Sequence, residues 1–201
     1  MSPEAVMEWS RKQFTDWQEA NAKSINSLEV QENTSISDCK WKAPEMGCIK
    51  INVDAAVKEG QDWFAIGMVA RNHLGHFLGG KTMKLAGRVS VVEVEMVGIS
   101  EAMSWAIDGI PGDVVVESDS LISVQNVLQA KENLLEIGDL MQQCRDILQE
   151  NSRLSLSFSR NQANRAAHCM ARISCEVNGF MIISSPPSQL LEILLSESSV
   201  Y

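Results

Sequence analysis

The fold of this chain is decided by the stretch Lys50-Ile51-Asn52-Val53-Asp54-Ala55-Ala56-Val57. Apolar residues alternate with polar ones up to Asp54, which is the period-two pattern of a β-strand. Aspartate is depleted in strands because its short side chain competes for backbone hydrogen bonds and its charge resists burial. Asp54 therefore either ends the strand in a turn or belongs to a functional site.

Two further acidic residues, Glu95 and Asp119, lie where helices are predicted to begin. Taken alone, each has a simple structural explanation. Glu95 could stabilise a helix dipole from the first turn, and Asp119 could cap the start of a helix. Together with Asp54, however, they offer three carboxylates that a single sheet could bring to one place.

The composition limits the kind of protein this can be. Its 201 residues, 45% of them apolar, suit one well-packed domain with appendages. The net charge of −9 argues against broad electrostatic attraction to nucleic acid or anionic membranes, so any contact with nucleic acid must be local. No apolar run approaches the roughly 20 residues of a membrane span, and the first residues lack the apolar segment of a signal peptide. Five cysteines, without CxxC or zinc-ligand spacing, predict reduced thiols in an intracellular protein of the nucleus or cytoplasm.

Changes in composition along the chain predict three parts. Residues 1–40 are expected to form an amphipathic helix followed by a polar linker. Residues 41–178 are expected to form the core domain, and residues 179–201 an apolar tail or helix. The tail could cover the edge of the sheet, or the tail or the first helix could contact a partner protein. We expect the chain to be a monomer.

The periodicity of the core predicts an α/β fold. Strands are expected near residues 50–57, 63–72, 76–85, 114–116 and 154–158, with helices near 89–107, 119–129, 135–150 and 162–177. Ser118 or Asp119 would cap the second of these helices. This order gives a mixed five-stranded sheet, with three antiparallel strands followed by parallel ones and helices on both faces.

Four segments, in this order along the chain, resemble the ribonuclease H fold. They are Lys50-Ile-Asn-Val-Asp54, Glu95-Met-Val-Gly-Ile-Ser-Glu-Ala-Met103, Glu117-Ser-Asp119-Ser and Asn164-Arg-Ala-Ala-His168-Cys-Met-Ala-Arg172. More closely, they resemble the plant ribonuclease H-like domains found at the C-terminal end of non-LTR retrotransposon reverse transcriptases and as free-standing genes. The resemblance covers about residues 41–195 and rests on the four segments together.

The resemblance implies a hydrolase that cuts the RNA strand of RNA–DNA hybrids by a two-metal-ion mechanism. Asp54, Glu95 and Asp119 would be the catalytic metal ligands, with Asp54 bridging two Mg²⁺ or Mn²⁺ ions. Carboxylates on rigid elements suit Mg²⁺, which prefers oxygen ligands. Without metal, three adjacent carboxylates should repel one another and raise at least one pKa.

His168 occupies the fourth catalytic position, where bacterial and retroviral relatives have aspartate. An imidazole is a poor ligand for Mg²⁺, so two interpretations remain open. His168 could donate a proton or contact a phosphate, or the domain could be a catalytically weakened binding or interaction module. Arg165 and Arg172 share the helix face of His168 and are expected to disfavour its imidazolium form.

Contacts to an RNA–DNA hybrid are less well defined by the sequence. Asn164 matches a position that helps to orient its helix and loop. Candidates for phosphate contacts are the basic residues near the expected site, namely Lys81, Lys84, Arg88, Arg160 and Arg165. The basic segment that strengthens hybrid binding in some relatives is not visible between Gln129 and Glu136, so we expect weak, salt-dependent binding.

Overall fold

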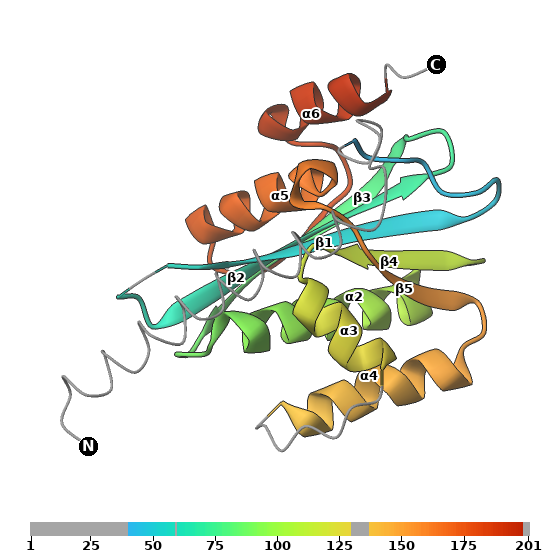
Figure 1. Ribbon diagram of the computed structural model, residues 1–201. Coiled ribbons are helices and arrows are strands. Elements are labelled where there is room, and N and C mark those ends of the chain that lie inside the picture. Colours follow the sequence, from blue (N-terminus) through green and yellow to red (C-terminus); the bar gives the residue numbers. More distant parts are fainter. Residues whose placement is uncertain (1–39, 59, 130–136, 199–201) are drawn as a thin grey trace, which may run out of the picture. The chain divides into compact units, whose positions relative to one another are not determined.

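The strand that carries Asp54 lies at the centre of the sheet in the computed structural model, which describes residues 40–58, 60–129 and 137–198. These residues belong to one compact unit (Figure 1). The predicted N-terminal helix and linker lie outside the described residues. None of the helices in the described part of the chain is long and apolar enough to cross a membrane.

The sheet of the described domain has six strands in the order β5-β4-β1-β2-β3-β6. The strands are β1 (Ile49–Val57), β2 (Trp63–Asn72), β3 (Phe77–Ala86), β4 (Val114–Ser118), β5 (Leu154–Phe158) and β6 (Gly179–Ile183). β1 pairs antiparallel with β2 and parallel with β4. The chain therefore has the mixed α/β sheet that its strand order predicts.

Helices cover both faces of the sheet, as Figure 1 shows. One face carries α2 (Val91–Gly109), α3 (Leu121–Leu128) and α4 (Gly138–Glu150). The other carries α5 (Arg165–Glu176) and α6 (Ser188–Ser198), and the short 3₁₀ helix η2 (Asn161–Ala163) precedes α5. Alternation along β1 explains this arrangement, because Ile51 and Val53 join the core under α2 while Asn52 and Asp54 point to the opposite face.

Gly67 of β2 allows α5 to lie directly on the sheet. A Cβ atom at this position would be 2.0 Å from the backbone nitrogen of Ala171 in α5. Around this contact, Val69 of β2 packs with Met170 of α5 and with Leu190 and Leu194 of α6. The backbone of α5 is therefore fixed at close range to the strand next to β1.

A buried polar cluster joins the residues before β1 to the last helix. Arg71 of β2 is 1% exposed, and its guanidinium carbon lies 3.6 Å from the centre of the Trp41 ring. Its Nη1 donates to Oε2 of Glu197 in α6 at 2.5 Å, and its Nη2 donates to Oδ1 of Asn52 at 3.0 Å. Trp41 Nε1 donates to the same Asn52 oxygen at 2.9 Å. A single buried cation thus connects α6, β1, β2 and the segment that leads into them.

The prediction of five strands was wrong by one. The additional strand is β6, which pairs antiparallel with β3 and forms the edge of the sheet. Its residues lie in the segment predicted to be an apolar tail. Apolar and polar residues do not alternate along this strand, and four of its five residues are exposed. A run of apolar residues without alternation gives no clear strand signal.

The start of the helix after β4 also differs from the prediction. Ser120 is the residue before α3, so neither Ser118 nor Asp119 caps it. Instead, Ser118 Oγ accepts a hydrogen bond from the backbone nitrogen of Ser120 at 3.1 Å and turns the chain there. Asp119 lies in this turn, between the strand and the helix.

Candidate active site

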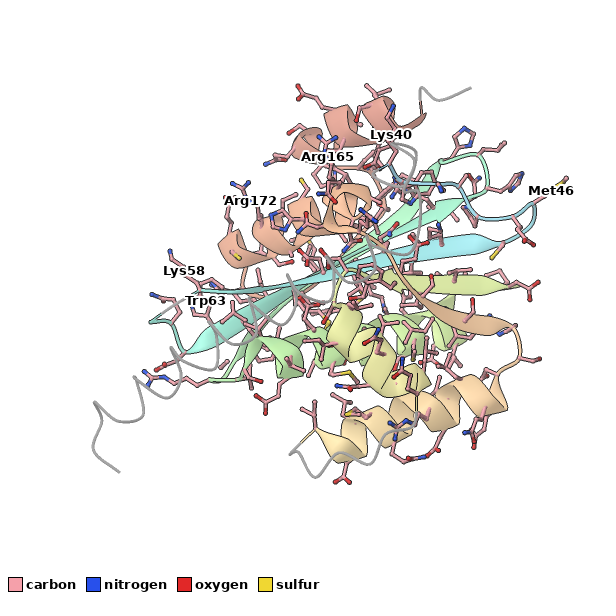
Figure 2. The ribbon with its side chains drawn as sticks, viewed as in Figure 1. Lys40, Met46, Lys58, Trp63, Arg165 and Arg172 are labelled. Atoms are coloured by element: carbon pink, nitrogen blue, oxygen red, sulfur yellow. The ribbon has the colours of Figure 1, made fainter. Side chains whose placement is uncertain are left out.

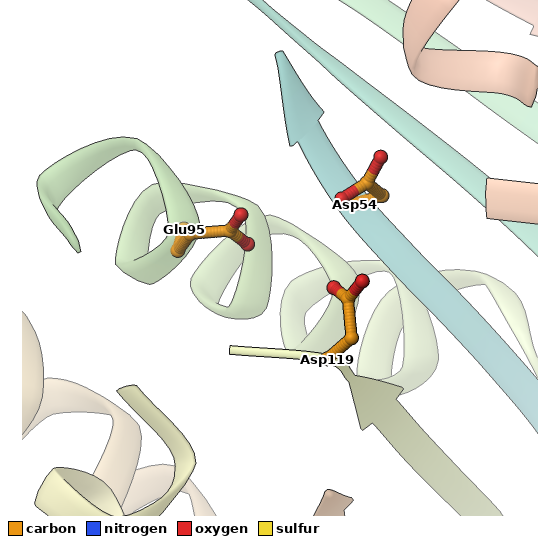
Figure 3. A group of neighbouring side chains, drawn as sticks. All are labelled: Asp54, Glu95 and Asp119. Atoms are coloured by element: carbon orange, nitrogen blue, oxygen red, sulfur yellow. The ribbon is translucent and has the colours of Figure 1, made fainter. Parts of the chain in front are cut away.

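Three carboxylates from separate parts of the sequence meet at one end of the sheet. Asp54 comes from β1, Glu95 from α2, and Asp119 from the turn after β4. One oxygen of each lies within 4.8 Å of the others, and Figure 3 shows the three carboxylates converging. The structure therefore brings together the three acids that the sequence singles out as metal ligands.

Local structure explains why these side chains meet. β1 and β4 are parallel neighbours with Val53 opposite Ser118, so the residues that follow them, Asp54 and Asp119, reach the same end of the sheet. Helix α2 begins at a capping box in which Ser90 and Glu93 exchange side-chain to backbone hydrogen bonds. Glu95 is the fifth residue of this helix, and its carboxylate lies next to those of the two aspartates. The acid that completes the cap is Glu93.

Burial and mutual repulsion change the acidity of the cluster. Asp54 is 5% exposed and Glu95 9% exposed. Burial first, and then the charges of Asp54 and Asp119, raise the pKa of Glu95 well above its usual value. Burial and Asp54 likewise raise the pKa of Asp119 to about 7, against a hydrogen bond from Asn164 that lowers it. As three adjacent carboxylates require, the cluster resists being fully ionised at neutral pH.

The donor set of this cluster fits a hard divalent cation. All three candidate ligands are carboxylates, and Mg²⁺ and Mn²⁺ prefer oxygen donors of this kind. A cation at this position would offset the repulsion that raises the pKa values of Glu95 and Asp119. Among the described residues, Asp54, Glu95 and Asp119 thus form a candidate binding site for a divalent metal ion.

His168 of α5 contacts this cluster directly. Its Nδ1 lies 3.0 Å from Oδ2 of Asp54, while 55% of its side chain is exposed. The hydrogen bond with Asp54 is the main cause that raises the pKa of His168, and Arg172 lowers it less. Arg172 therefore disfavours the imidazolium as expected, but the carboxylate of Asp54 outweighs it, so that the pKa of His168 is raised overall.

Asn164 links the start of α5 to the carboxylates. It is fully buried, and its Nδ2 donates to the backbone oxygen of Val53 at 2.9 Å and to Oδ1 of Asp119 at 3.2 Å. One amide therefore joins β1 and the turn after β4 to the residue that precedes α5. This placement suits the positioning role that the sequence predicts for Asn164.

The basic candidates for substrate contacts lie in different surroundings. Arg165 is exposed one turn before His168 on α5. Lys84 donates to the backbone oxygen of Cys175 at 3.0 Å, and Arg88 forms an exposed ion pair with Asp62. Of these three residues, Arg165 is the one that lies on the same helix as His168.

The remaining two candidates differ as well. Lys81 lies on the α2 face, with its Nζ 5.0 Å from the ring centre of Trp105 and 5.6 Å from that of Phe180. Arg160 precedes η2, the short helix that leads into α5. Lys81 is therefore held by aromatic rings on the face opposite α5.

A groove runs between α5 and α6 beside His168. Its volume is about 660 Å³, and its lining includes Arg165, His168, Arg172, Gln189, Glu192 and Ser196. The sequence did not identify the α6 side of this groove, because the recognised motifs end with α5. An amphipathic pattern over residues 188–198 was the available signal, but it does not reveal which helix α6 packs against.

Comparisons with known proteins agree with this arrangement. Residues 52–174 match the family described as Reverse transcriptase-like. An Arabidopsis thaliana protein named "Putative ribonuclease H protein" is 24% identical over 155 residues, which are 75% of this chain and 25% of that protein. The chain thus spans about a quarter of the length of the curated relative that it matches.

Solved structures share the fold at low sequence identity. LC11-RNase H1, isolated from compost by a metagenomic approach, has a TM-score of 0.57 and 17% identity, over 65% of this chain and 97% of that one. The same protein in complex with an RNA/DNA hybrid has a TM-score of 0.55 and 16% identity, over 64% and 96%. RNase H1 of Halobacterium salinarum has a TM-score of 0.54 and 17% identity, over 65% and 98%.

Three findings thus agree: a family match over more than half of the chain, a shared fold, and carboxylates gathered at the end of β1 and β4. The match begins at Asn52 in β1 and ends at Ser174 in α5, so it includes all three acids and His168. The chain therefore belongs to the reverse transcriptase-like family and contains a ribonuclease H-like domain.

Proposed function

We propose that this chain is an endonuclease that hydrolyses the RNA strand of RNA–DNA hybrids with two divalent metal ions. The observation that carries the proposal is the meeting of three carboxylates within 4.8 Å of one another. The similarity to a ribonuclease H1 solved in complex with an RNA/DNA hybrid supports this substrate class. A hybrid combines one strand with 2′-hydroxyl groups and one without, which a ribonuclease H must distinguish.

Asp54, Glu95 and Asp119 would hold the Mg²⁺ or Mn²⁺ ions. When bound, such ions lower the barrier for attack of water on a phosphate and neutralise charge on the leaving oxygen. The three carboxylates give the site negative charge at a fixed position, since they come from a central strand, a capped helix and a constrained turn. Asn164 would keep Asp119 aligned with β1 through its two donated hydrogen bonds.

His168 would act at the edge of this site. Its contact with Asp54 raises its pKa and so favours the protonated imidazole. A protonated imidazole can donate a proton to a leaving oxygen or a hydrogen bond to a phosphate. Because more than half of its side chain is exposed, His168 can reach a substrate on the surface. Arg165, exposed one turn earlier, would contact a nearby phosphate.

A second candidate function is a binding module with weak or no turnover. The observation that favours it is also the contact of His168 with Asp54. The imidazole engages Oδ2 of Asp54, a candidate metal ligand, and the raised pKa of His168 favours a positive charge beside the cation site. The net charge of −9 agrees with weak affinity for nucleic acid.

A cleavage assay distinguishes the two functions. The full chain is incubated with a hybrid labelled on its RNA strand, in Mg²⁺ and separately in Mn²⁺, beside Asp54→Asn. Asp108→Asn, at the exposed far end of α2, is a matched control that removes the same charge outside the cluster. We expect cleavage of RNA by the wild type and the control, and loss by at least about 100-fold in Asp54→Asn. Equal cleavage by the wild type and Asp54→Asn would falsify the enzyme assignment.

A further inference from the structure

A second hollow with basic walls lies on the α5 side of the sheet, at the end of β1. Its volume is about 350 Å³, and it is lined by Lys58, Trp63, Arg172, Cys175 and Glu176. Figure 2 shows Lys58, Trp63 and Arg172 gathered at the same end of the sheet. These residues come from the end of β1, the start of β2 and the second half of α5.

Positive charge predominates around this basic hollow. Burial raises the pKa of the Cys175 thiol, while the charges of Lys84, Lys58 and Arg172 lower it and that of Glu176 raises it. Three cations therefore surround the thiol against one acid. In the described residues, no carboxylate forms an ion pair with Lys58 or Arg172, and both side chains are exposed.

Lys84 and Trp63 form a fixed wall of the basic hollow. The Nζ atom of Lys84 lies 4.2 Å from the centre of the Trp63 ring and donates to the backbone oxygen of Cys175. Trp63 Nε1 donates to Gln61 at 3.1 Å. Since these contacts hold Lys84 in place, Lys58 and Arg172 are the two cations with freedom to bind a ligand.

The hollow lies at a defined separation from the candidate active site. Lys58 follows Asp54 by four residues, which is about 13 Å along a strand. Arg172 follows His168 by four residues, which is about 6 Å along a helix. Since a nucleic-acid strand advances about 3.4 Å along its axis per phosphate, Arg172 and Lys58 are about two to four phosphates away from a phosphate at the carboxylates.

We propose that Lys58 and Arg172 form a phosphate-binding subsite for the nucleic-acid strand that flanks the cleavage position. The inference rests on the proposed function for its substrate class. Phosphate suits this site because guanidinium and ammonium groups both form charge-assisted hydrogen bonds with its oxygens. The net charge of −9 gives the whole chain no electrostatic attraction to nucleic acid. A local group of cations near the candidate active site would supply that attraction where the substrate binds.

Binding measurements over a range of salt concentrations test the subsite. The full chain with Asp54→Asn, which prevents cleavage, is titrated into a fluorescent RNA–DNA hybrid in Mg²⁺, between about 50 and 200 mM NaCl. We expect Lys58→Gln and Arg172→Gln each to weaken binding and to reduce the slope of log K against log salt by about one. Lys40→Gln removes the same charge from an exposed residue outside the hollow and is expected to leave the slope unchanged. Lys58→Arg and Arg172→Lys keep the charge and should retain the slope.

A modified substrate gives a second measurement, in which the parent protein itself reports the position of the subsite. Single neutral methylphosphonates are placed in turn along the hybrid. The parent protein should lose affinity at a position about two to four phosphates from the cleavage position, and the Lys58→Gln/Arg172→Gln double variant should not. Three results would overturn the subsite. They are an unchanged salt slope in the double variant, a loss of affinity in Lys40→Gln equal to that in the Lys58 and Arg172 variants, and absence of hybrid binding by the parent. Failure of the proposed function is a separate result, since it appears as absence of cleavage by the wild type while these binding slopes can still be measured.

Discussion

The Nδ1 atom of His168 lies 3.0 Å from Oδ2 of Asp54, across the boundary between α5 and the central strand of the sheet. This contact joins the exposed imidazole of α5 to one of the three clustered carboxylates. It raises the pKa of His168. The metal affinity of the site is therefore expected to depend on the residue at position 168.

Replacing His168 with aspartate should strengthen metal binding. His168→Asp removes a cation that competes for Asp54 and supplies a further oxygen ligand, so Mg²⁺ should bind at least about tenfold more tightly. Isothermal titration of Mg²⁺ into the full chain measures this change. His168→Asn is the matched control, because it adds an uncharged oxygen and should give a smaller gain. Unchanged or weaker Mg²⁺ binding by His168→Asp would contradict the assignment of Asp54 as a ligand.

The metal-free protein should lose stability as the pH rises. Glu95 and Asp119 have raised pKa values when folded, about 7 for Asp119, so the folded state holds protons that the unfolded state releases near pH 4. This stabilising contribution is complete below the unfolded pKa and is lost as the pH passes the folded one. The raised pKa of His168 acts in the same direction. Thermal unfolding in EDTA between about pH 5 and 8 should therefore show a loss of a few kcal/mol.

Two additions test the origin of this pH dependence. Mg²⁺ should restore the lost stability at the upper end of the range, because it binds the ionised carboxylates of the folded state. Asp119→Asn should flatten the profile, because it removes one of the raised groups. A profile that stays the same in Asp119→Asn would show that another group causes the change.

A methyl group at Gly67 should disrupt the packing of α5. The added Cβ would lie 2.0 Å from the backbone of Ala171, and backbone on both sides cannot move away. We expect Gly67→Ala to lower the free energy of unfolding by at least about 3 kcal/mol. Gly79→Ala is the control, since its nearest contact would be 3.6 Å. Urea denaturation measures both, and similar midpoints would contradict the close approach of α5 to β2.

Loss of Glu197 should destabilise the domain more than loss of an exposed acid. Arg71 is almost fully buried, so Glu197→Ala leaves its charge without a counter-ion and should cost about 3–5 kcal/mol. Asp62→Asn breaks the exposed pair with Arg88 and should cost less than about 1 kcal/mol. Replacing both partners, as Arg71→Met with Glu197→Leu, should recover much of the loss. Urea denaturation of the four proteins gives the comparison, and equal losses for the two acids would refute it.

The sequence predicted the central features of the fold and the candidate site from local patterns. Alternation in β1 identified the strand that carries Asp54, and the order of strands and helices predicted the mixed sheet with helices on both faces. The expected positions of Glu95 near the start of a helix and of Asp119 after a parallel strand also came from local features. Each of these patterns lies in the residues that surround one acid in the sequence, so it can be recognised without coordinates.

Other features depend on contacts between distant residues and could not be predicted. β6 has four exposed residues of five, so neither its strand state nor its pairing with β3 has a signal in its own sequence. The direction of the pKa shift of His168 depends on Asp54, which is 114 residues away in sequence. The helix neighbours of His168 are visible in the sequence, but the carboxylate that outweighs them is not.

The pairing of Arg71 with Glu197 also has a consequence for folding during synthesis. The two residues are 126 positions apart, so the central strands emerge from the ribosome long before the acid that neutralises Arg71. Until then, burying Arg71 leaves a charge in an apolar environment, which is strongly unfavourable. The finished domain is therefore expected to form after synthesis of α6, with the earlier strands held in an incomplete, solvated state.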